Sequence, residues 1–395
     1  MDKTRSIIDL LQELTRIPSR AGVDSYQPIV DLTRNWLRGR GIACELLVDN
    51  QKMVGLYAIV AGAGAMSARG PIYMLNATLD TAEFGDESRW TDPPTSGCIH
   101  DGWIYGRGCA DSKAGVSLFC HVLAEMAAST SGWCGTCVLL LDLEEHTGAF
   151  AGIRHYLQPS NGLPRPQGVF IGYPGNDRIV VGSRGFVRCV ITLHGVAAHS
   201  GSSRGAGVNA IVRAANLVDR LSALRLPAVV TLDEQFPLPP NLTVTGIEGG
   251  GGFSMVPDTC RVLVDVRLTP IFGENAAKTI VQNVVEEVNR AETRAPETSV
   301  EWNQAWPAYH ISEAHPMVGA LRRAAIHEFK RDILTGVVGP SNIGNYLQTL
   351  HIPATAGFGV TYRAIHALNE CVELASLDPV YRTYRTALRE LFSAP

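Results

Sequence analysis

Helix-forming segments alternate with short apolar runs along the first half of the chain, and this alternation constrains the fold more than any other feature. The apolar runs span residues 53–60, 71–75, 136–143 and 168–171, and amphipathic helices are predicted at 6–15 and 26–40. Short runs rich in β-branched residues are typical of buried strands in an α/β sheet. The first part of the chain is therefore predicted to be an α/β domain.

The pattern changes near residue 186 and changes back near residue 307. Between these points, strands are predicted at 186–193, 241–247 and 260–268, and helices at 207–224 and 276–290. Elements of this size predict a smaller α+β two-layer sandwich inserted into the larger domain. The predicted domains are 1–185 and 304–395 for a large α/β domain with a mixed sheet, and 186–303 for the insertion.

Composition excludes several classes of protein. The 395 residues are too many for one ordinary core, which favours two domains. The net charge is −4 and the Lys and Arg residues are scattered, which argues against a nucleic-acid partner. The N-terminal helix mixes acids and bases, and no apolar run reaches spanning length, so no membrane partner is expected. Nine cysteines without a regular spacing suit a reducing compartment and predict a cytoplasmic location.

A glycine-hinged loop places one carboxylate at a prominent position. Residues 105–116 read YGRGCADSKAGV, and a helix is predicted at 113–126. Gly106 and Gly108 permit backbone angles that let the loop turn tightly and direct Asp111 inward. Asp111 is then either a helix cap, the more frequent role for such an aspartate, or a metal ligand.

Further polar residues follow the predicted strands. Directly after apolar runs come Thr78, Asp80, Glu144, Glu145 and Tyr173. Because functional residues of α/β sheets gather at the carboxyl ends of the strands, these side chains predict a convergent site. The two glutamates alone would also fit a solvated turn.

Seven short motifs in a fixed order point to a known family. They are TLD at 78–80, WTDPP at 90–94, DGWIYGRGCADSKAG at 101–115, LEEHTGA at 143–149, AAHSG at 197–201, VPD followed by VDVRL within 256–268, and IHALNE at 365–370. In these motifs the chain resembles the co-catalytic zinc amidohydrolases and exopeptidases that include acetylornithine deacetylase, succinyl-diaminopimelate desuccinylase, aminoacylase and glutamate carboxypeptidase. The resemblance spans nearly the whole chain.

The resemblance implies roles at a metal centre. Asp111, Glu145 and His366 match metal ligands, and in the family the residue at Asp111 bridges two metals. Glu144 matches the general base that takes a proton from the attacking water. Asp, Glu and His with one open position are the usual make-up of a hydrolytic zinc site. The expected cofactor is therefore zinc, and the expected substrate is a small amide or peptide.

Three further residues match positions that contact the substrate. His199 matches a histidine that stabilises the oxyanion, often from the partner subunit, so a homodimer formed through the inserted lid or dimerisation domain is expected. Arg267 matches an arginine that binds a substrate carboxylate. Asn342 falls where the family lines its substrate pocket. On the residues alone, Arg267 also fits a surface strand, and His199 fits an exposed loop.

The chain departs from the family at two ligands of the same metal. The family has His two residues before the acid at Asp80, where this chain has Thr78, and Asp or Glu before a proline, where this chain has Tyr173. The other ligand set is complete, so one zinc is expected, with His146 as a further candidate ligand. A phenol, whose pKa is about 10, is a poor ligand. The Tyr173 hydroxyl is instead predicted to face the substrate carbonyl or the leaving group.

Three functions stay open on the sequence. The first is a one-metal amidohydrolase or peptidase acting on a small carboxylate-bearing amide, such as an N-acyl amino acid or a peptide. The second is the same scaffold used for acyl transfer, amide formation or cyclisation in a biosynthetic pathway. The third is a non-catalytic binding protein, which is disfavoured because the motif residues occur together.

Overall fold

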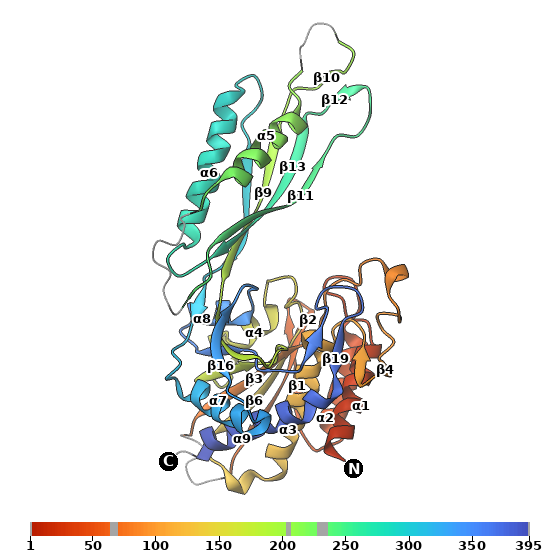
Figure 1. The fold of residues 1–395 in the computed structure, drawn as a ribbon, viewed down its shortest axis with the longest axis vertical. Coiled ribbons are helices and arrows are strands. Elements are labelled where there is room, and N and C mark those ends of the chain that lie inside the picture. Colours follow the sequence, from red (N-terminus) through yellow and green to blue (C-terminus); the bar gives the residue numbers. More distant parts are fainter. Residues whose placement is uncertain (1, 64–69, 203–206, 227–235, 394–395) are drawn as a thin grey trace. The chain divides into compact units, whose positions relative to one another are not determined.

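The computed structural model describes residues 2–63, 70–202, 207–226 and 236–393 (Figure 1). The chain divides into two compact units. The first unit comprises Met1–Gly182, His310–Gly336 and Asn342–Pro395, and the second comprises Ser183–Tyr309 and Val337–Ser341. The predicted limits of the folding domains, 1–185, 186–303 and 304–395, stay predictions.

The first unit is built on a six-stranded mixed sheet with the strand order β1-β2-β6-β3-β7-β17. The strands are β1 (Cys44–Asp49), β2 (Lys52–Ala61), β6 (Thr136–Asp142), β3 (Ile72–Thr78), β7 (Gly168–Ile171) and β17 (Ala354–Ala356). The last four in this order are parallel, whereas β2 is antiparallel to β6 and to β1. β3 and β6 are buried along nearly their whole length, as their continuous apolar runs predict.

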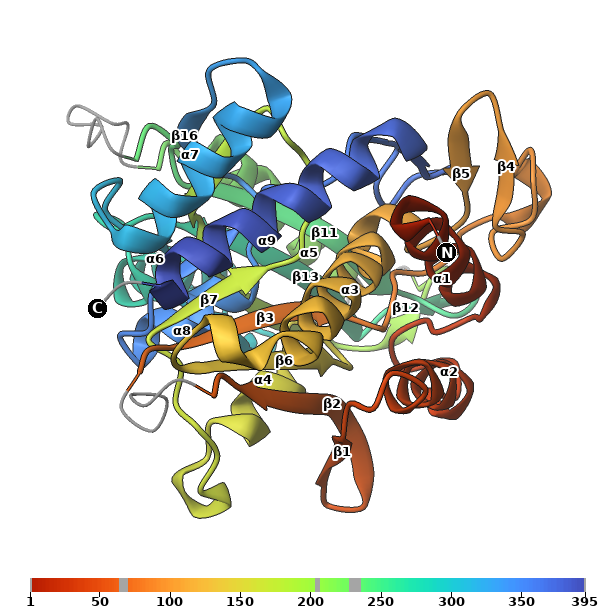
Figure 2. The same cartoon turned by 90° about the horizontal axis from the view of Figure 1, so that it is seen from below.

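Helices pack on this sheet through their apolar faces. α3 (Ala114–Ala128) contacts β3 and β6, and it also contacts α1 (Lys3–Arg16) and α9 (Leu377–Ser393). Figure 2 shows α3 and α9 side by side. α4 (Ala151–Tyr156) contacts β2 and β6, and α8 (Ile343–Thr349) contacts β17. The other helices of this unit are α2 (Gln27–Arg38) and α7 (Pro316–Phe329).

A small four-stranded sheet brings two distant segments of the chain together. Its order is β18-β19-β5-β4. The strands are β18 (Tyr362–Arg363), β19 (Cys371–Glu373), β5 (Trp103–Tyr105) and β4 (Cys98–His100). Cys371 of β19 pairs with Tyr105 of β5. The loop that follows β5 and the loop that joins β18 to β19 are therefore neighbours, and these loops carry Asp111 and His366.

The second unit is a two-layer sandwich. Four antiparallel strands have the order β11-β13-β9-β14. They are β11 (Asn241–Gly249), β13 (Thr259–Leu268), β9 (Gly185–His194) and β14 (Ser299–Trp306). α5 (Ala210–Ala223) and α6 (Glu274–Ala291) pack on this sheet and on each other, over the alternate buried residues of β9 and β13. Beyond the sheet, β10 (Ala198–His199) pairs with β12 (Met255–Val256).

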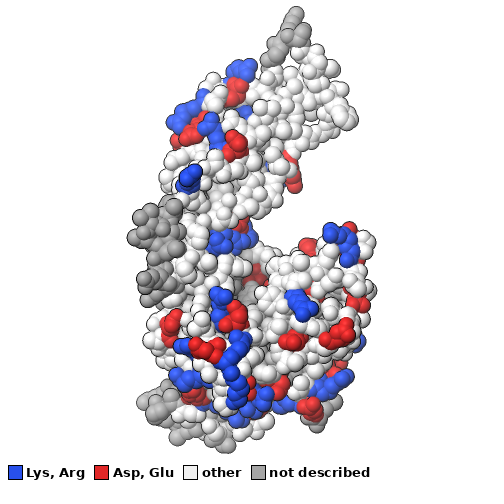
Figure 3. Space-filling view, in the orientation of Figure 1, with Lys and Arg blue, Asp and Glu red and all other residues white. Residues whose placement is uncertain are grey.

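The predicted fold class is confirmed: a large mixed α/β sheet is combined with a smaller α+β sandwich. A further three-stranded sheet has the order β15-β8-β16, formed by β15 (Tyr309–His310), β8 (Arg178–Ser183) and β16 (Leu334–Val338). On the face drawn in Figure 3, acidic and basic side chains are interspersed. Within the described ranges, no helix has both the length and the apolar character needed to cross a membrane. The cytoplasmic location stays a prediction.

Candidate active site

Two glycines shape the loop that carries Asp111. Gly106 has φ 149° and Gly108 has φ 81°, angles that are costly for residues with a Cβ. A Cβ at Gly108 would also lie 2.2 Å from Cγ2 of Thr81. The turn η3 (Cys109–Lys113) follows and leads into α3. The loop therefore turns as the sequence predicts, and it buries the Asp111 side chain.

An ion pair fixes this loop from the far end of the chain. Oε1 of Glu370 accepts hydrogen bonds from the backbone N–H groups of Ala110 (3.0 Å) and Asp111 (3.2 Å). Oε2 of Glu370 is 2.7 Å from Nη1 of Arg107, and both side chains are buried. Nε of Arg107 donates to the carbonyl of Glu83. Glu370 is the last residue of the IHALNE motif, but no role was predicted for it.

His366 lies in the loop between β18 and β19. Its Nε2 is 3.1 Å from Oδ2 of Asp111. Its φ is 56°, an uncommon value for a residue other than glycine, and such strain gathers at functional sites. The His366 side chain is 52% exposed, so this edge of the site opens to solvent.

Asp80 organises the segment that follows β6. Its carboxylate accepts hydrogen bonds from the backbone N–H groups of Glu145 (3.1 Å) and His146 (3.0 Å). Oδ2 of Asp80 is also 3.2 Å from Nδ1 of the His146 ring. The other ring nitrogen, Nε2, is 3.7 Å from Oδ2 of Asp111. Asp80 therefore orients His146 towards Asp111, a role that only the three-dimensional arrangement reveals.

The two residues that replace family ligands are both engaged in hydrogen bonds. Thr78 is the last residue of β3, and its hydroxyl donates to Asp80. Tyr173 follows β7, and its hydroxyl donates to Glu145. The predicted role of Tyr173 at the substrate carbonyl or the leaving group stays a prediction.

Glu144, the predicted general base, lies in the turn after β6 with φ 68°. Its Oε1 accepts a hydrogen bond of 2.8 Å from the Tyr26 hydroxyl. The same oxygen is 3.1 Å from Nζ of Lys52. These two groups hold the carboxylate in one orientation. Neither Tyr26, just before α2, nor Lys52, at the start of β2, belongs to a sequence motif that predicts this contact.

Burial and charge act in opposite directions on the buried acids. Burial raises the pKa of Asp80 and of Asp111. The hydrogen bond and charge of His146 at Asp80, and the neighbouring imidazoles of His146 and His366 at Asp111, outweigh burial and hold both pKa values below their ordinary range. Burial, together with the charge of Asp111, raises the pKa of Glu145 to about 7. Burial lowers the pKa of His146, but Asp111 and Asp80 more than reverse this and raise it. Negative charge is thus concentrated around one imidazole.

The residues present fit a divalent metal ion. One ligand atom each from Asp111, His146 and His366 lie within 4.8 Å of one another. Oδ1 of Asp111 and Nε2 of His146 are among the buried side-chain atoms of the described residues that have no hydrogen-bond partner, and most buried polar atoms in proteins have one. Carboxylate oxygens and imidazole nitrogens are ligands that zinc prefers, and such an ion would polarise an amide carbonyl. Glu145, the predicted third ligand, is not part of this group.

Two of the predicted substrate-contacting residues lie in the second unit. His199 is exposed in β10. In β13, Nε of Arg267 is 2.7 Å from Oδ1 of Asp265, and its Nη1 donates to the Ser341 hydroxyl at 3.1 Å. Asp265 also pairs with Arg188 at 2.9 Å. Two guanidinium groups thus share one carboxylate and retain a net positive charge.

Asn342 is the N-cap of α8. Its Oδ1 accepts a hydrogen bond from the backbone N–H of Gly344 (2.8 Å), and its own backbone N–H donates to Oδ1 of Asn345 (2.7 Å). A capping box of this kind satisfies backbone donors at the start of a helix. The buried Asn342 side chain therefore has a structural role, and its predicted contact with substrate stays a prediction.

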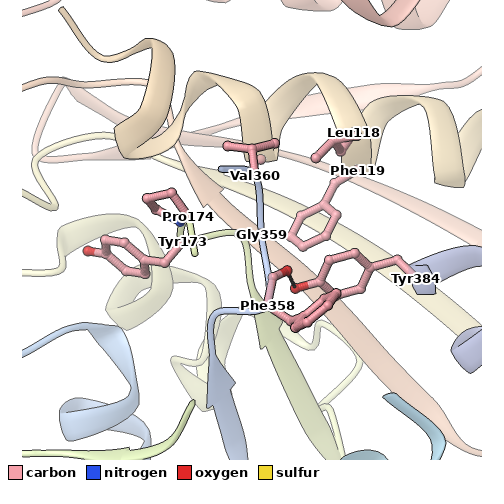
Figure 4. A pocket seen from close by; sticks show the side chains of 10 residues that line it. Leu118, Phe119, Tyr173, Pro174, Phe358, Gly359, Val360 and Tyr384 are labelled. Carbon is pink, nitrogen blue, oxygen red and sulfur yellow. Dashed lines mark hydrogen bonds between the residues drawn. The ribbon is translucent and has the colours of Figure 1, made fainter. Parts of the chain in front are cut away.

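A small pocket lies beside the backbone of Tyr173. Its lining comes from α3, from segments 172–174 and 358–360, and from Tyr384. In Figure 4 the Tyr173 phenol points away from Phe119 and Tyr384, whose rings meet edge to face at a centroid distance of 4.8 Å. The Tyr384 hydroxyl donates to the carbonyl of Phe358. These apolar walls anchor the Tyr173 segment and offer little to a polar substrate.

The family of this chain follows from its similarity to known proteins. The sequence profile of Peptidase family M20/M25/M40 matches residues 74–390, a span that includes Asp111, Glu144, Glu145, His146 and His366. The chain belongs to this family. As a member of the M20 family with desuccinylase relatives, it is a hydrolase that acts on amide bonds.

Relatives and solved structures agree with this assignment. A succinyl-diaminopimelate desuccinylase of Rhodospirillum centenum is 27% identical over 405 residues, which covers 98% of this chain and 97% of the relative. An M20 family metallo-carboxypeptidase from Sulfolobus solfataricus has a TM-score of 0.79 at 16% identity, with 99% of both chains covered. A dinuclear metal-binding M20 peptidase from Bacillus subtilis has a TM-score of 0.71 at 14% identity, covering 100% of this chain and 99% of its own. These structures have the same fold as this chain.

Proposed function

We propose that this M20 hydrolase uses one zinc ion to cleave a small carboxylate-bearing amide, such as an N-acyl amino acid or a peptide. The observation that carries the proposal is the approach of Nε2 of His366 to Oδ2 of Asp111, which are 3.1 Å apart. On the family pattern, Asp111, Glu145 and His366 are the ligands. Thr78 and Tyr173 replace both ligands that belong to the other metal alone, which supports a single ion.

The proposed reaction assigns a task to each of three side chains. Glu144 takes a proton from the attacking water and delivers it to the leaving nitrogen, as a positioned carboxylate can. The contacts of Glu144 with Tyr26 and Lys52 support this role because they fix its orientation. His199 donates a hydrogen bond to the developing oxyanion, and Tyr173 assists at the carbonyl or the leaving group.

The arginines of the second unit support an anionic substrate. Arg267 and Arg188 share Asp265, so the group has more positive than negative charge. Arg184 adds to it: burial and the charge of Arg267 both lower the pKa of Arg184. The planar fork of a guanidinium suits a carboxylate. Because a desuccinylase is among the relatives, N-succinyl amino acids are the first substrates to test.

Hydrolysis of such amides is expected to depend on the metal. The full-length protein is stripped with a chelator, dialysed, and assayed with and without zinc against N-succinyl and N-acetyl amino acids and dipeptides. We expect cleavage only after reloading. A substrate whose free carboxylate is converted to the carboxamide should lose at least about 10-fold in kcat/KM, because a neutral amide forms weaker hydrogen bonds with a guanidinium than a carboxylate does.

A separate experimental result would contradict each part of the proposal. Cleavage that persists in the stripped protein would rule out a metal-dependent reaction. Equal kcat/KM for the carboxylate and carboxamide substrates would remove Arg267 from carboxylate binding. If the zinc-loaded protein cleaves none of these amides, the proposed substrate class is wrong, and acyl transfer from the same amides to added amines becomes the next assay.

The second unit is also the proposed site of homodimerisation. Exposed apolar side chains occur at the start of α5, near the end of β11, just before β12 and in β12 itself; they are Ile211, Val212, Ile247, Phe253 and Met255. Figure 3 shows an uncharged surface over β12 and the adjoining end of β11. His199 pairs with Met255 in this surface. A second copy that covers it would bring in the His199 of its partner, as the family resemblance implies.

Replacing Phe253 by aspartate is expected to convert a dimer into a 42.6 kDa monomer. Phe253 is fully exposed, and a charge at the centre of an apolar interface would be buried without a partner. Light scattering after size-exclusion chromatography measures the mass. The control is Ile271→Asp, since Ile271 is exposed in the same unit outside this group. A monomeric unaltered protein, or a Phe253→Asp variant that stays dimeric, would contradict the proposed interface.

A further inference from the structure

We propose that His146 is a metal ligand and takes the place of Glu145, so that the ion is held by Asp111, His146 and His366. The inference deepens the proposed function, and it rests on that proposal only in requiring that the site holds a metal. It assigns the site a ligand set with two imidazoles, where the family pattern predicts one.

Two buried atoms that face the proposed ion have no hydrogen-bond partner among the described residues. His146 is buried, with a side chain 6% exposed, and its Nε2 has no hydrogen-bond partner among the described residues. The 3.7 Å between this nitrogen and Oδ2 of Asp111 is too long for a hydrogen bond. Oδ1 of Asp111 is likewise buried and unpartnered. An ion shared by Asp111 and His146 would satisfy both atoms.

Asp80 holds the His146 imidazole in the manner expected for a metal ligand. Asp80 accepts from the His146 backbone N–H at 3.0 Å and lies 3.2 Å from Nδ1 of the same residue. A carboxylate at Nδ1 keeps the proton on that nitrogen and leaves the lone pair of Nε2 available. Metal-ligating histidines commonly have such a carboxylate on the opposite nitrogen, where it fixes the tautomer and the ring orientation. His146 therefore has the surroundings of a ligand.

Glu145 contacts groups other than the three converging ligand atoms. Its Oε1 accepts the hydrogen bond of the Tyr173 hydroxyl. Its Oε2 lies 3.6 Å from Nδ1 of His146, on the edge of the ring that faces Asp80. Both carboxylate oxygens of Glu145 thus have a close neighbour, Tyr173 at Oε1 and Nδ1 of His146 at Oε2. Glu145 supports His146 and Tyr173, and it does not join the three converging ligand atoms.

Together these contacts explain the substitution at position 78. Threonine there cannot supply an imidazole, and its hydroxyl donates to Asp80. Asp80 nevertheless retains a histidine partner, which now comes from the turn after β6. The histidine that the family has at position 78, at the end of β3, is thus replaced by His146, which follows β6. The His146 ring faces the same carboxylate, Asp111.

The test is cobalt binding by the full-length, chelator-stripped protein, followed through the visible absorption of Co²⁺. His146→Gln is expected to weaken Co²⁺ binding by more than about 100-fold, as His366→Gln should, because each removes a direct ligand. Glu145→Gln is expected to change it by less than about 10-fold. Asp80→Asn should weaken it by about 10–100-fold, the usual cost of losing the partner that orients a ligand. The matched control is His155→Gln, since His155 also lies near an aspartate, Asp49, but outside the site.

A second measurement avoids variants that fail to fold. X-ray absorption of the zinc-loaded, unaltered protein counts the imidazoles on the metal: two support the inference, and one overturns it. If Glu145→Gln abolishes binding and His146→Gln does not, the family ligand set is correct, and the proposed function stands without this inference. Two cobalt ions per chain would overturn the single site. No binding by the unaltered protein would overturn both the inference and the metal-dependent function.

Discussion

Replacing Glu144 by glutamine is expected to lower kcat for amide hydrolysis by about 10²–10⁴-fold, the range that a positioned general base contributes. Glutamine keeps the size of the side chain and still accepts the hydrogen bond from Tyr26, but it cannot take a proton. The metal content should be unchanged, because Glu144 is not among the three residues whose ligand atoms converge. Steady-state kinetics and elemental analysis on the same preparation measure both quantities.

The matched control for this variant is Glu45→Gln. Glu45 lies in β1 and accepts a 2.7 Å hydrogen bond from the Tyr57 hydroxyl, so it forms the same kind of pair away from the site. Its replacement should leave kcat unchanged. A loss of less than about 10-fold for Glu144→Gln would remove Glu144 as the base. A loss of bound metal would show that it acts as a ligand instead.

Replacing Glu370 by alanine is expected to destabilise the fold by about 3–5 kcal/mol, since removal of one partner leaves a buried charge unpaired. Arg107, only 3% exposed, would lose the carboxylate 2.7 Å from its Nη1. The backbone N–H groups of Ala110 and Asp111 would lose their acceptor as well. Urea unfolding measures the free energy, and a lower midpoint at an unchanged slope would indicate a loss of stability alone.

Glu287→Ala is the control for this second prediction. Glu287 pairs with Arg220 at 2.6 Å, but these side chains are 48% and 37% exposed, so water replaces the lost partner. Its removal should cost about 0–1 kcal/mol. If Glu370→Ala costs no more than this control, the Arg107–Glu370 pair does not stabilise the Asp111 loop. Metal affinity of the Glu370→Ala variant then reports whether the loop has moved.

Hydrophobic patterns predict most of the fold because they depend on local spacing. The run at 168–171 is β7, and the run at 136–143 differs from β6 by one residue. The long C-terminal helix α9 is absent from the prediction, although buried residues such as Val380, Tyr381 and Tyr384 have the spacing of a helix face. The antiparallel pairing of β2 with β6 also had no local signal, since strand direction is decided by the connections.

The site was only partly predictable, for reasons of distance along the chain. Asp111 and His366 could be predicted from motifs, but the hydrogen bond from Tyr26 to Glu144 joins residues that lie 118 positions apart in the sequence. The pairing of Asp80 with His146 joins residues 66 positions apart and depends on β3 lying beside β6. Motifs identify residue types, whereas such partnerships follow from sheet order. Whether Glu145 or His146 ligates the metal is therefore a question that only the folded arrangement raises.

The contact of Glu370 with the Asp111 loop has a consequence for biosynthesis. A chain leaves the ribosome N-terminus first, and domains tend to fold as they emerge. When the ribosome has synthesised residues 105–116, it must still translate more than 200 residues before it reaches His366 and Glu370. The reason is that the contact between Asp111 and Glu370 spans 259 positions. A nascent chain thus has the strands β3 and β6 long before Glu370 is available to the Asp111 loop. Chains that stop short of residue 370 would lack the acceptor of the Ala110 and Asp111 N–H groups and the carboxylate partner of the buried Arg107.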